Sequence, residues 1–326
     1  MKPKILVARE VFPEVIARLF QHFEVDDNQA DVVLGIEGLK SRLADKHGVL
    51  TAATDPVTAE VLAAAPHLQA VCNFAVGYNN IDLAACTSAG VMATNTPGVL
   101  DDTTADLAWA LLMASARRLP AAERWLRNGE WKGWQFIQWL GSDIHHATLG
   151  ILGMGRIGRA IARRATGFSM PVIYHNRTRL PANLEGGARH VALPDLLRES
   201  DHLVLVVPYS PEVHHLIDAA ALAQMKPTAV LVNIARGGVV DDRALVAALR
   251  NGLIAAAGLD VFENEPALHP GLLELENVVL TPHIASSTRA TRTAMAHLAM
   301  SNLRAALAGQ VPPSLVNPEV LQNRRR

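Results

Sequence analysis

The chain has 326 residues, more than one compact core usually contains, which favours two domains of roughly 100–200 residues each. Half of the residues are hydrophobic and 19% are charged, which excludes a disordered chain. Because 30 Lys and Arg stand against 31 Asp and Glu, bulk charge supplies neither a basic surface for nucleic acid nor a strongly acidic surface. We therefore expect no nucleic-acid partner.

The first apolar run covers only residues 5–8 before a charge follows. It is too short for a signal sequence or a membrane span, so we interpret it as a buried strand. Cys72 and Cys86 lack the spacing and the His neighbours of a zinc or redox site, which favours two inert buried thiols. These features predict a cytoplasmic protein without a membrane partner.

Short apolar runs alternate with stretches of helical period through the first hundred residues. The predicted strands are residues 5–8, 49–52 and 70–74, and the predicted helices are 13–22, 59–65 and 81–88. This alternation is typical of βαβ units around a parallel sheet. A turn cluster at 95–98 precedes one long helical segment at 103–119, so we place a domain boundary there.

A second alternation of the same kind follows. Its predicted strands are residues 148–152, 172–175, 202–208, 229–234, 254–261 and 278–281. A helix is expected from Arg156 to about Gly167, and a last one at 288–308. These elements are enough for a complete doubly wound sheet.

The segment between the two alternations, residues 121–146, holds four of the five tryptophans: Trp125, Trp131, Trp134 and Trp139. Such a density of large rings exceeds what a small lobe readily covers, so we interpret the segment as an arm that packs on another surface. A core within the same chain is the alternative.

The strongest local motif is Gly153, Gly155 and Gly158, which follows an apolar strand and opens a helix. In that setting, GxGxxG predicts a dinucleotide site: the first glycine permits the tight turn, the second leaves room for the pyrophosphate, and the third lets the helix approach the strand.

The end of the next strand indicates which dinucleotide binds. NAD-binding sequences usually place Asp or Glu there, but this chain has Asn176, Arg177, Thr178 and Arg179. Two arginines and no carboxylate favour the 2′-phosphate of NADPH, with NADH as the weaker cofactor. A solvated basic turn is the alternative.

Four charged residues, Arg236, Asp260, Glu265 and His283, follow later strands, where open α/β sheets bind their ligands. Singly, Arg236 or His283 could be structural. Together with the glycine motif, the set predicts an active site.

The whole chain, from the first strand to the last helix, resembles the D-isomer-specific 2-hydroxyacid dehydrogenases. Within them it is most similar to the bacterial glyoxylate/hydroxypyruvate reductases, also called 2-ketoaldonate or 2-ketogluconate reductases, and five segments carry the match. The segments are residues 76–82, 145–158, 233–241, 260–266 and 282–286. The resemblance implies an α/β fold with two Rossmann-like doubly wound domains. These would be a discontinuous substrate domain, residues 1–98 plus 288–326, and a dinucleotide-binding domain, residues 99–287.

The resemblance also implies reduction of small 2-keto acids to D-2-hydroxy acids. Arg236 would bind the carboxylate and keto oxygen, and the backbone of Val76 and Gly77 would hold the carboxylate from another side. His283 would protonate the carbonyl oxygen, oriented by Glu265. A homodimer is implied in which Trp139 reaches the partner's substrate cleft.

The residues expected at the cofactor come from the glycine motif and the same resemblance. They are Thr104, Gly153, Met154, Gly155, Arg156, Ile157, Gly158, Asn176, Arg177, Thr178, Arg179, Pro208, Ala235, Asp260 and His283. Asp260 would meet the nicotinamide carboxamide.

Other interpretations stay open. An NAD-linked dehydrogenase of another substrate would share the fold. Phosphite oxidation is disfavoured because related enzymes have Lys where this chain has Val76. A dinucleotide-sensing corepressor or scaffold could keep the same residues, so only turnover separates it. The adjacent pairs His145/His146 and His214/His215 show no further ligands in the sequence, and no metal is expected.

Overall fold

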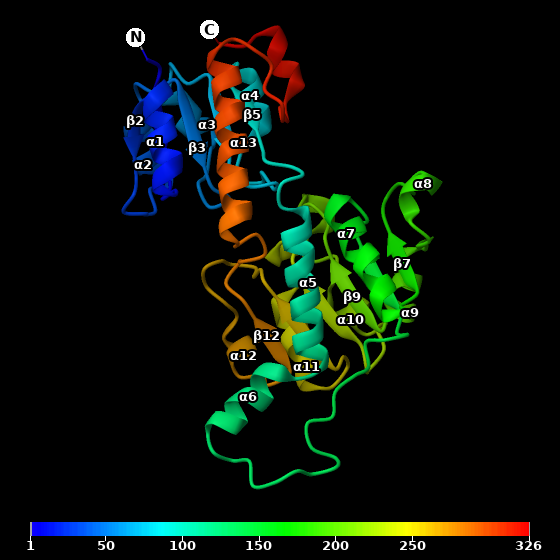
Figure 1. The fold of residues 1–326 in the computed structure, drawn as a ribbon. Coiled ribbons are helices and arrows are strands. Elements are labelled where there is room, and N and C mark those ends of the chain that lie inside the picture. Colours follow the sequence, from blue (N-terminus) through cyan, green and yellow to red (C-terminus); the bar gives the residue numbers. More distant parts are fainter. Residues whose placement is uncertain (1, 326) are drawn as a thin grey trace. The chain divides into compact units, whose positions relative to one another are not determined.

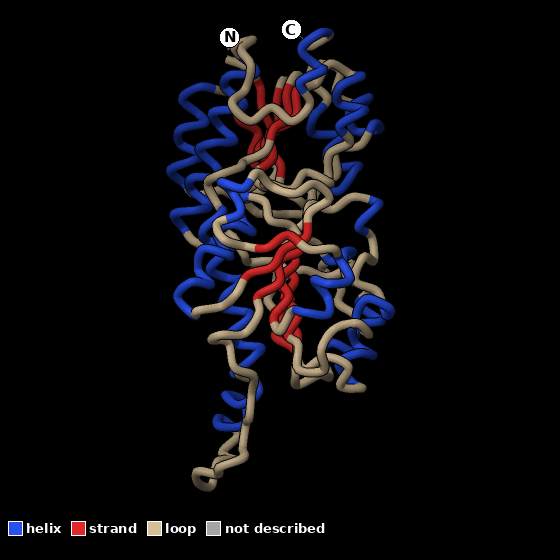
Figure 2. The backbone as a smooth tube through the Cα atoms, turned by 90° about the vertical axis from the view of Figure 1, so that its right-hand side faces the viewer, coloured by secondary structure: helices blue, strands red, loops and turns tan. Residues whose placement is uncertain are grey.

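The computed structural model describes residues 2–325, and the chain divides into two compact units (Figure 1). One unit combines residues 1–100 with 288–326, and the other consists of residues 101–287. Within each unit the strands form a central layer with helices on both sides (Figure 2). None of the described helices has both the length and the apolar composition needed to cross a lipid bilayer.

The first unit contains a five-stranded parallel sheet in the order β2-β1-β3-β4-β5. Its strands are β1 (Lys4–Val7), β2 (Glu24–Asp27), β3 (Gly48–Thr51), β4 (Ala70–Asn73) and β5 (Met92–Thr94). Its helices are α1 (Pro13–His22), α2 (Gly35–Leu43), α3 (Ala59–Ala63), α4 (Leu83–Ser88), α13 (Arg289–Leu307) and the short 3₁₀ helix η4 (Pro318–Gln322).

Both faces of this sheet are buried, because successive residues of a strand point to opposite sides. On β1, Ile5 and Val7 pack into the cluster that α13 covers, whereas Leu6 packs into the opposite cluster under α2 and α3. Cys72 and Cys86 are buried and unpaired, and burial raises the pKa of each thiol to about 12. The prediction of buried thiols is confirmed.

The second unit contains a seven-stranded parallel sheet in the order β12-β11-β10-β9-β6-β7-β8. Its strands are β6 (Leu149–Leu152), β7 (Val172–His175), β8 (Arg189–His190), β9 (His202–Leu205), β10 (Val230–Asn233), β11 (Ala256–Leu259) and β12 (Val278–Leu280). Its helices are α5 (Asp101–Ala116), α6 (Leu119–Arg127), α7 (Arg156–Ala165), α8 (Ala182–Glu185), α9 (Leu193–Glu199), α10 (Ala219–Leu222), α11 (Asp242–Arg250) and α12 (Pro270–Leu273), with 3₁₀ helices η1 (Thr166–Phe168), η2 (Pro211–Val213) and η3 (Gly237–Val239).

The predicted α/β class with doubly wound parallel sheets is confirmed. In the second unit, β6 is the first strand in sequence but lies inside the sheet between β7 and β9. The strand order therefore reverses at β6 and β9, and such a reversal creates a ligand-binding crevice at the carboxyl ends of the strands.

Two boundaries differ from the sequence prediction. The helix expected over residues 103–119 begins at Asp101 and ends at Ala116, because Arg118 adopts a left-handed conformation with φ of 53° and α6 begins at Leu119, with Pro120 in its first turn. Strands β2, β5 and β8 were not predicted.

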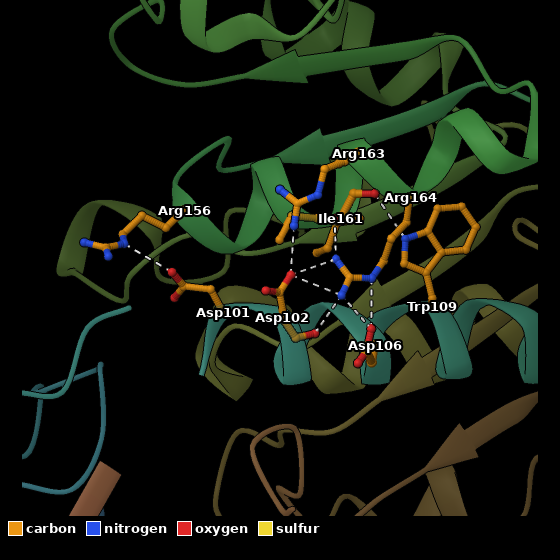
Figure 3. A network of polar contacts seen from close by, with 9 residues as sticks. Asp101, Asp102, Asp106, Trp109, Arg156, Ile161, Arg163 and Arg164 are labelled. Atoms are coloured by element: carbon orange, nitrogen blue, oxygen red, sulfur yellow. Dashed lines mark hydrogen bonds and ion pairs between the residues drawn. The ribbon is translucent and has the colours of Figure 1, made fainter. Parts of the chain in front are cut away.

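Polar contacts attach α7 to α5 (Figure 3). Arg163 and Arg164 of α7 pair with Asp102 of α5 at 2.8 and 3.2 Å. The indole of Trp109 donates a hydrogen bond to the carbonyl of Ile161 at 3.1 Å. Because α7 starts at Arg156, inside the glycine motif, this network fixes the direction in which its N-terminus points.

Candidate active site

The loop between β6 and α7 has the shape that the glycine motif predicts. Gly153 has φ of +103°, and a Cβ there would lie 2.8 Å from the backbone of Val206. A Cβ at Gly158 would lie 2.3 Å from the carbonyl of Gly153, so only glycine allows α7 to approach the strand this closely.

The N-terminus of α7 is open to a ligand. A Cβ at Gly155 would meet no atom within 4 Å, and no side chain of the described residues caps the helix. Free N–H groups at the positive end of a helix dipole suit an anion, so the loop fits a dinucleotide pyrophosphate. The side chain of Arg156 turns aside and pairs with Asp101 at 3.1 Å (Figure 3).

The residues after β7 show a difference from the sequence prediction. Nε and Nη2 of Arg179 donate hydrogen bonds to the two carboxylate oxygens of Glu185, at 2.8 and 3.1 Å. Glu185 is buried and also accepts a hydrogen bond from the Tyr174 hydroxyl at 2.7 Å. The hydrogen bonds from Arg179 and then Tyr174 lower the pKa of Glu185 to about 2. The charge of Arg179 is thus already compensated.

Arg177 differs from Arg179 in this respect. It is exposed, and within the described chain it has no ion pair within 4.0 Å. Thr178 beside it is also exposed. The side-chain oxygen of Asn176 accepts a hydrogen bond from the amide of Met154 at 2.7 Å, which ties the end of β7 to the glycine loop.

Arg236, Glu265 and His283 all lie at the carboxyl end of the second sheet, after β10, β11 and β12. Nδ1 of His283 is 2.8 Å from Oε2 of Glu265. The backbone of His283 is left-handed, with φ of 53°, a costly conformation for a residue with a side chain. Two carbonyls, those of Asp260 and Thr281, hold its amide at 2.9 and 3.0 Å.

Gly237 allows the loop after β10, which carries Arg236, to lie close to the loop after β11, which carries Glu265. A Cβ at Gly237 would lie 1.9 Å from the backbone of Phe262, so the two loops pack backbone to backbone. Burial lowers the pKa of Arg236 and Glu265 opposes this effect, but an arginine stays charged at neutral pH.

The charge state of Glu265 follows from its neighbours. Its burial alone would raise its pKa, but the hydrogen bond and charge of His283, the amide of Phe262 and the charge of Arg236 lower it below the ordinary value. Glu265 is therefore an anion at neutral pH and suits a protonated imidazole beside it.

The contacts of Asp260 in the structure are all within the protein, and its contact with the nicotinamide stays a prediction. It is 0% exposed, and its oxygens accept hydrogen bonds from the Thr281 hydroxyl at 2.7 Å and from the amides of Ile284 and Ala285 at 2.8 Å each. A carboxylate with these partners and no exposed surface holds the turn around His283 in place. We therefore interpret Asp260 as a residue that positions His283.

The remaining predicted residues have these locations. Thr104, Met154 and Ala235 are buried, Ile157 is half-buried in the first turn of α7, and Pro208 is exposed after β9. In the first unit, the carbonyls of Val76 and Gly77 accept hydrogen bonds from Asn95 and Asn73 at 2.8 and 2.9 Å. Within the described chain, the amides of Val76 and Gly77 donate no hydrogen bond and remain available to a ligand.

The tryptophan-rich segment is a surface feature. Trp139 packs edge-on against Trp125, with ring centroids 5.8 Å apart, and Arg118 lies over its ring at 5.0 Å. Beyond this contact the large side chains face outward: Trp134 is 79% and Phe136 is 82% exposed. A core formed within the same chain is therefore excluded for the outer part of the segment.

A glycine loop at a strand-order reversal, with an Arg/Glu/His set at the same sheet edge, defines a dinucleotide-dependent oxidoreductase. Comparison with known proteins gives the same class. Residues 109–285 match the model of the D-isomer specific 2-hydroxyacid dehydrogenase NAD binding domain. The chain belongs to the D-isomer specific 2-hydroxyacid dehydrogenase family, as the resemblance predicted.

Individual relatives match the chain over its whole length. A glyoxylate reductase of Thermococcus onnurineus is 50% identical, with 100% of this chain and 99% of the relative covered. The NADPH-dependent glyoxylate/hydroxypyruvate reductase of Sinorhizobium meliloti, solved with NADP and malonate, is 37% identical with a TM-score of 0.88, covering 100% and 99%. A glyoxylate reductase of Paecilomyes thermophila is 36% identical with a TM-score of 0.87, covering 98% and 99%.

Proposed function

We propose that the enzyme reduces small 2-keto acids, of the glyoxylate, hydroxypyruvate and 2-ketogluconate class, to D-2-hydroxy acids. The observation that supports this most is the 2.8 Å contact between His283 and Glu265 at the sheet edge that also carries Arg236. The similarity to glyoxylate reductases over the full length supports the substrate class.

The proposed mechanism assigns one task to each group. When bound, the reduced dinucleotide would supply the hydride that C2 of the keto acid accepts. Arg236 pairs with the carboxylate and the keto oxygen, because its planar fork of donors matches both. The free amides of Val76 and Gly77 hold the carboxylate. His283 gives the proton on Nε2 to the keto oxygen, while Glu265 stabilises the charged ring through Nδ1 before the transfer.

NADPH is the proposed cofactor, with NADH used less well. Asn176 stands where an acidic residue would repel a 2′-phosphate, and Arg177 is exposed with no ion pair in the described chain. The relative from Sinorhizobium meliloti is NADPH-dependent. Of the two arginines, we assign the phosphate to Arg177, since Arg179 is held by Glu185.

We also propose a homodimer in which the segment from Trp125 to Trp139 packs on the partner and Trp139 reaches the partner's substrate cleft. Its exposed apolar side chains support this, because a monomer would leave them in water. Light scattering should give twice the chain mass at assay concentration. A fully active monomer would refute the dimer. A cytoplasmic location is also proposed, in keeping with two unpaired cysteines.

The function is tested by initial rates with glyoxylate, hydroxypyruvate, pyruvate and 2-ketogluconate, each with NADPH and NADH. We expect turnover of at least one of these acids and a higher kcat/KM with NADPH. If dinucleotide binds but none of the four acids is reduced, the chain is instead a sensor or corepressor of the same fold. Oxidation of phosphite in place of hydroxy acids would also overturn the proposal.

A further inference from the structure

A cluster of metal-binding side chains lies outside the proposed catalytic set. His214 and His215 follow η2, and Glu263 follows β11. One ligand atom from each lies within 4.8 Å of the others. The sequence shows His214 and His215 as an adjacent pair without further ligands, and the structure corrects this, because it brings Glu263 to the pair from 48 residues further along the chain.

The three side chains contact one another, and His214 has a further partner. Nε2 of His215 is hydrogen-bonded to Oε1 of Glu263, and the imidazole rings of His214 and His215 stack with centroids 3.9 Å apart. Nδ1 of His214 contacts the Tyr209 hydroxyl at 3.0 Å. The Tyr209 hydroxyl is a contact of the kind that orients metal ligands. The two rings stack at 22°, so their in-plane lone pairs are nearly parallel, and binding one ion would turn one ring out of the stack and replace the His215–Glu263 hydrogen bond.

The backbone around the cluster is also constrained. His215 has a left-handed backbone with φ of 51°, and its amide is held by the carbonyl of Gly238 at 2.8 Å. The amide of Glu263 donates to the buried carboxylate of Asp242 at 3.2 Å. A left-handed non-glycine residue is costly and is often found at functional positions. Here it turns the second imidazole toward Glu263.

We propose that His214, His215 and Glu263 bind one divalent transition-metal ion. Two imidazoles and one carboxylate suit Zn²⁺, Co²⁺ or Ni²⁺, whereas Mg²⁺ and Ca²⁺ prefer oxygen ligands alone. With three protein ligands, water completes a tetrahedral shell. His214 is exposed and the side chains of His215 and Glu263 are 34% and 26% exposed, so a hydrated ion has a path to all three.

The ion would connect two segments of the proposed active site. Glu263 stands two residues before Glu265, and the backbone of Gly237, next to Arg236, packs on Phe262 and Glu263. Binding therefore restrains the loops after β10 and β11 together, and the folded state gains stability because the unfolded chain does not hold the three ligands in place.

Untagged full-length protein, freed of metal with EDTA and then desalted, is titrated with Co²⁺ followed by visible absorption, and with Zn²⁺ by calorimetry and thermal melting. We expect one equivalent per chain, a higher melting temperature with Zn²⁺, and no such response to Mg²⁺. Glu263→Gln and His214→Ala should each weaken binding about 10-fold or more.

The matched control is His145→Ala. His145 and His146 are also adjacent, with ring centroids 5.2 Å apart, but no carboxylate joins them among the described residues. This variant should bind like the wild type. The proposal is overturned if the wild type takes up no Co²⁺ or Zn²⁺ at a stoichiometric concentration, or if His145→Ala weakens binding as much as the two cluster variants. The wild-type titration decides even if a variant folds poorly.

Discussion

Arg177→Ala should remove most of the preference for NADPH, whereas Arg179→Ala combined with Glu185→Gln should change it little. A charge-assisted hydrogen bond contributes about 1.5–3 kcal/mol, or roughly 10- to 150-fold in a binding constant. Arg177 is exposed, so screening by water and salt places the expected loss near 10-fold in kcat/KM for NADPH. Arg179 directs two N–H groups to Glu185, so removing the pair costs the phosphate no hydrogen bond, and replacing both residues leaves no uncompensated carboxylate.

The assay compares kcat/KM for NADPH and NADH at a fixed keto acid, first for the wild type and then for each arginine variant. The kcat/KM for NADH should be nearly the same in the wild type and the variants, because the 2′-hydroxyl of NADH carries no charge. Raising the salt concentration should reduce the difference in kcat/KM for NADPH between the wild type and Arg177→Ala, because salt screens the charge of Arg177. Glu185→Gln supplies a further check, since it releases the fork of Arg179 and should raise the preference for NADPH, provided that its melting temperature shows a folded protein. Equal losses in the two arginine variants, or a wild type that uses NADH as well as NADPH, would refute the reasoning.

Three further expectations follow from the site and the core. His283→Ala should lower kcat by about 10²–10⁴, as expected for the loss of a general acid, and Glu265→Gln should lower it less while altering the pH profile of kcat; near-normal turnover of the His283 variant would contradict the mechanism. Gly155→Val should keep its melting temperature but lose NADPH binding in a fluorescence titration, because the added side chain meets no protein atom and enters the open space proposed for the pyrophosphate. Gly158→Ala is the control, because its added methyl group would clash with the Gly153 carbonyl inside the protein. It should lose about 1–3 kcal/mol of unfolding free energy. Cys72 should resist a thiol reagent at pH 8 in the native protein and react after unfolding in guanidinium, since burial raises its pKa to about 12; labelling of the folded protein would show that the core opens readily.

The sequence predicted the interior strands of both sheets and missed three strands at sheet edges. Strand β2, Glu24–Asp27, has one apolar residue among three acidic ones, and it lies beside β1 at the edge of the first sheet. Strand β8 has only two residues, and β5 only three. Strand β2 is mostly acidic and β5 and β8 are too short to give an apolar run, whereas the edge strand β12 (Val278–Leu280) has such a run and was predicted.

In the candidate site, the positions of residues after strands could be predicted from the sequence, but their side-chain partners could not. Arg236 and His283 were predictable because each follows a strand whose carboxyl end faces the same edge of the sheet. The partner of Arg179 was not predictable. Glu185 lies at the end of the short helix α8, and the hydrogen bond that it accepts from Tyr174 holds it beside Arg179. Likewise, the approach of Glu263 to His215 across 48 residues depends on how the loops after β9 and β11 pack.

The discontinuous first unit has a consequence for folding during synthesis. Helix α13 contributes Ala299, Met300 and Leu303 to the apolar cluster that covers one face of the first sheet, together with Ile5 and Val7 of β1. On the ribosome, residues 1–100 therefore emerge long before the helix that completes their core. Residues 101–287 contain all the strands of their own sheet and can fold as soon as they emerge. We expect the later segment of the chain to reach its native state first, the reverse of the N-terminal-first order common in multidomain proteins.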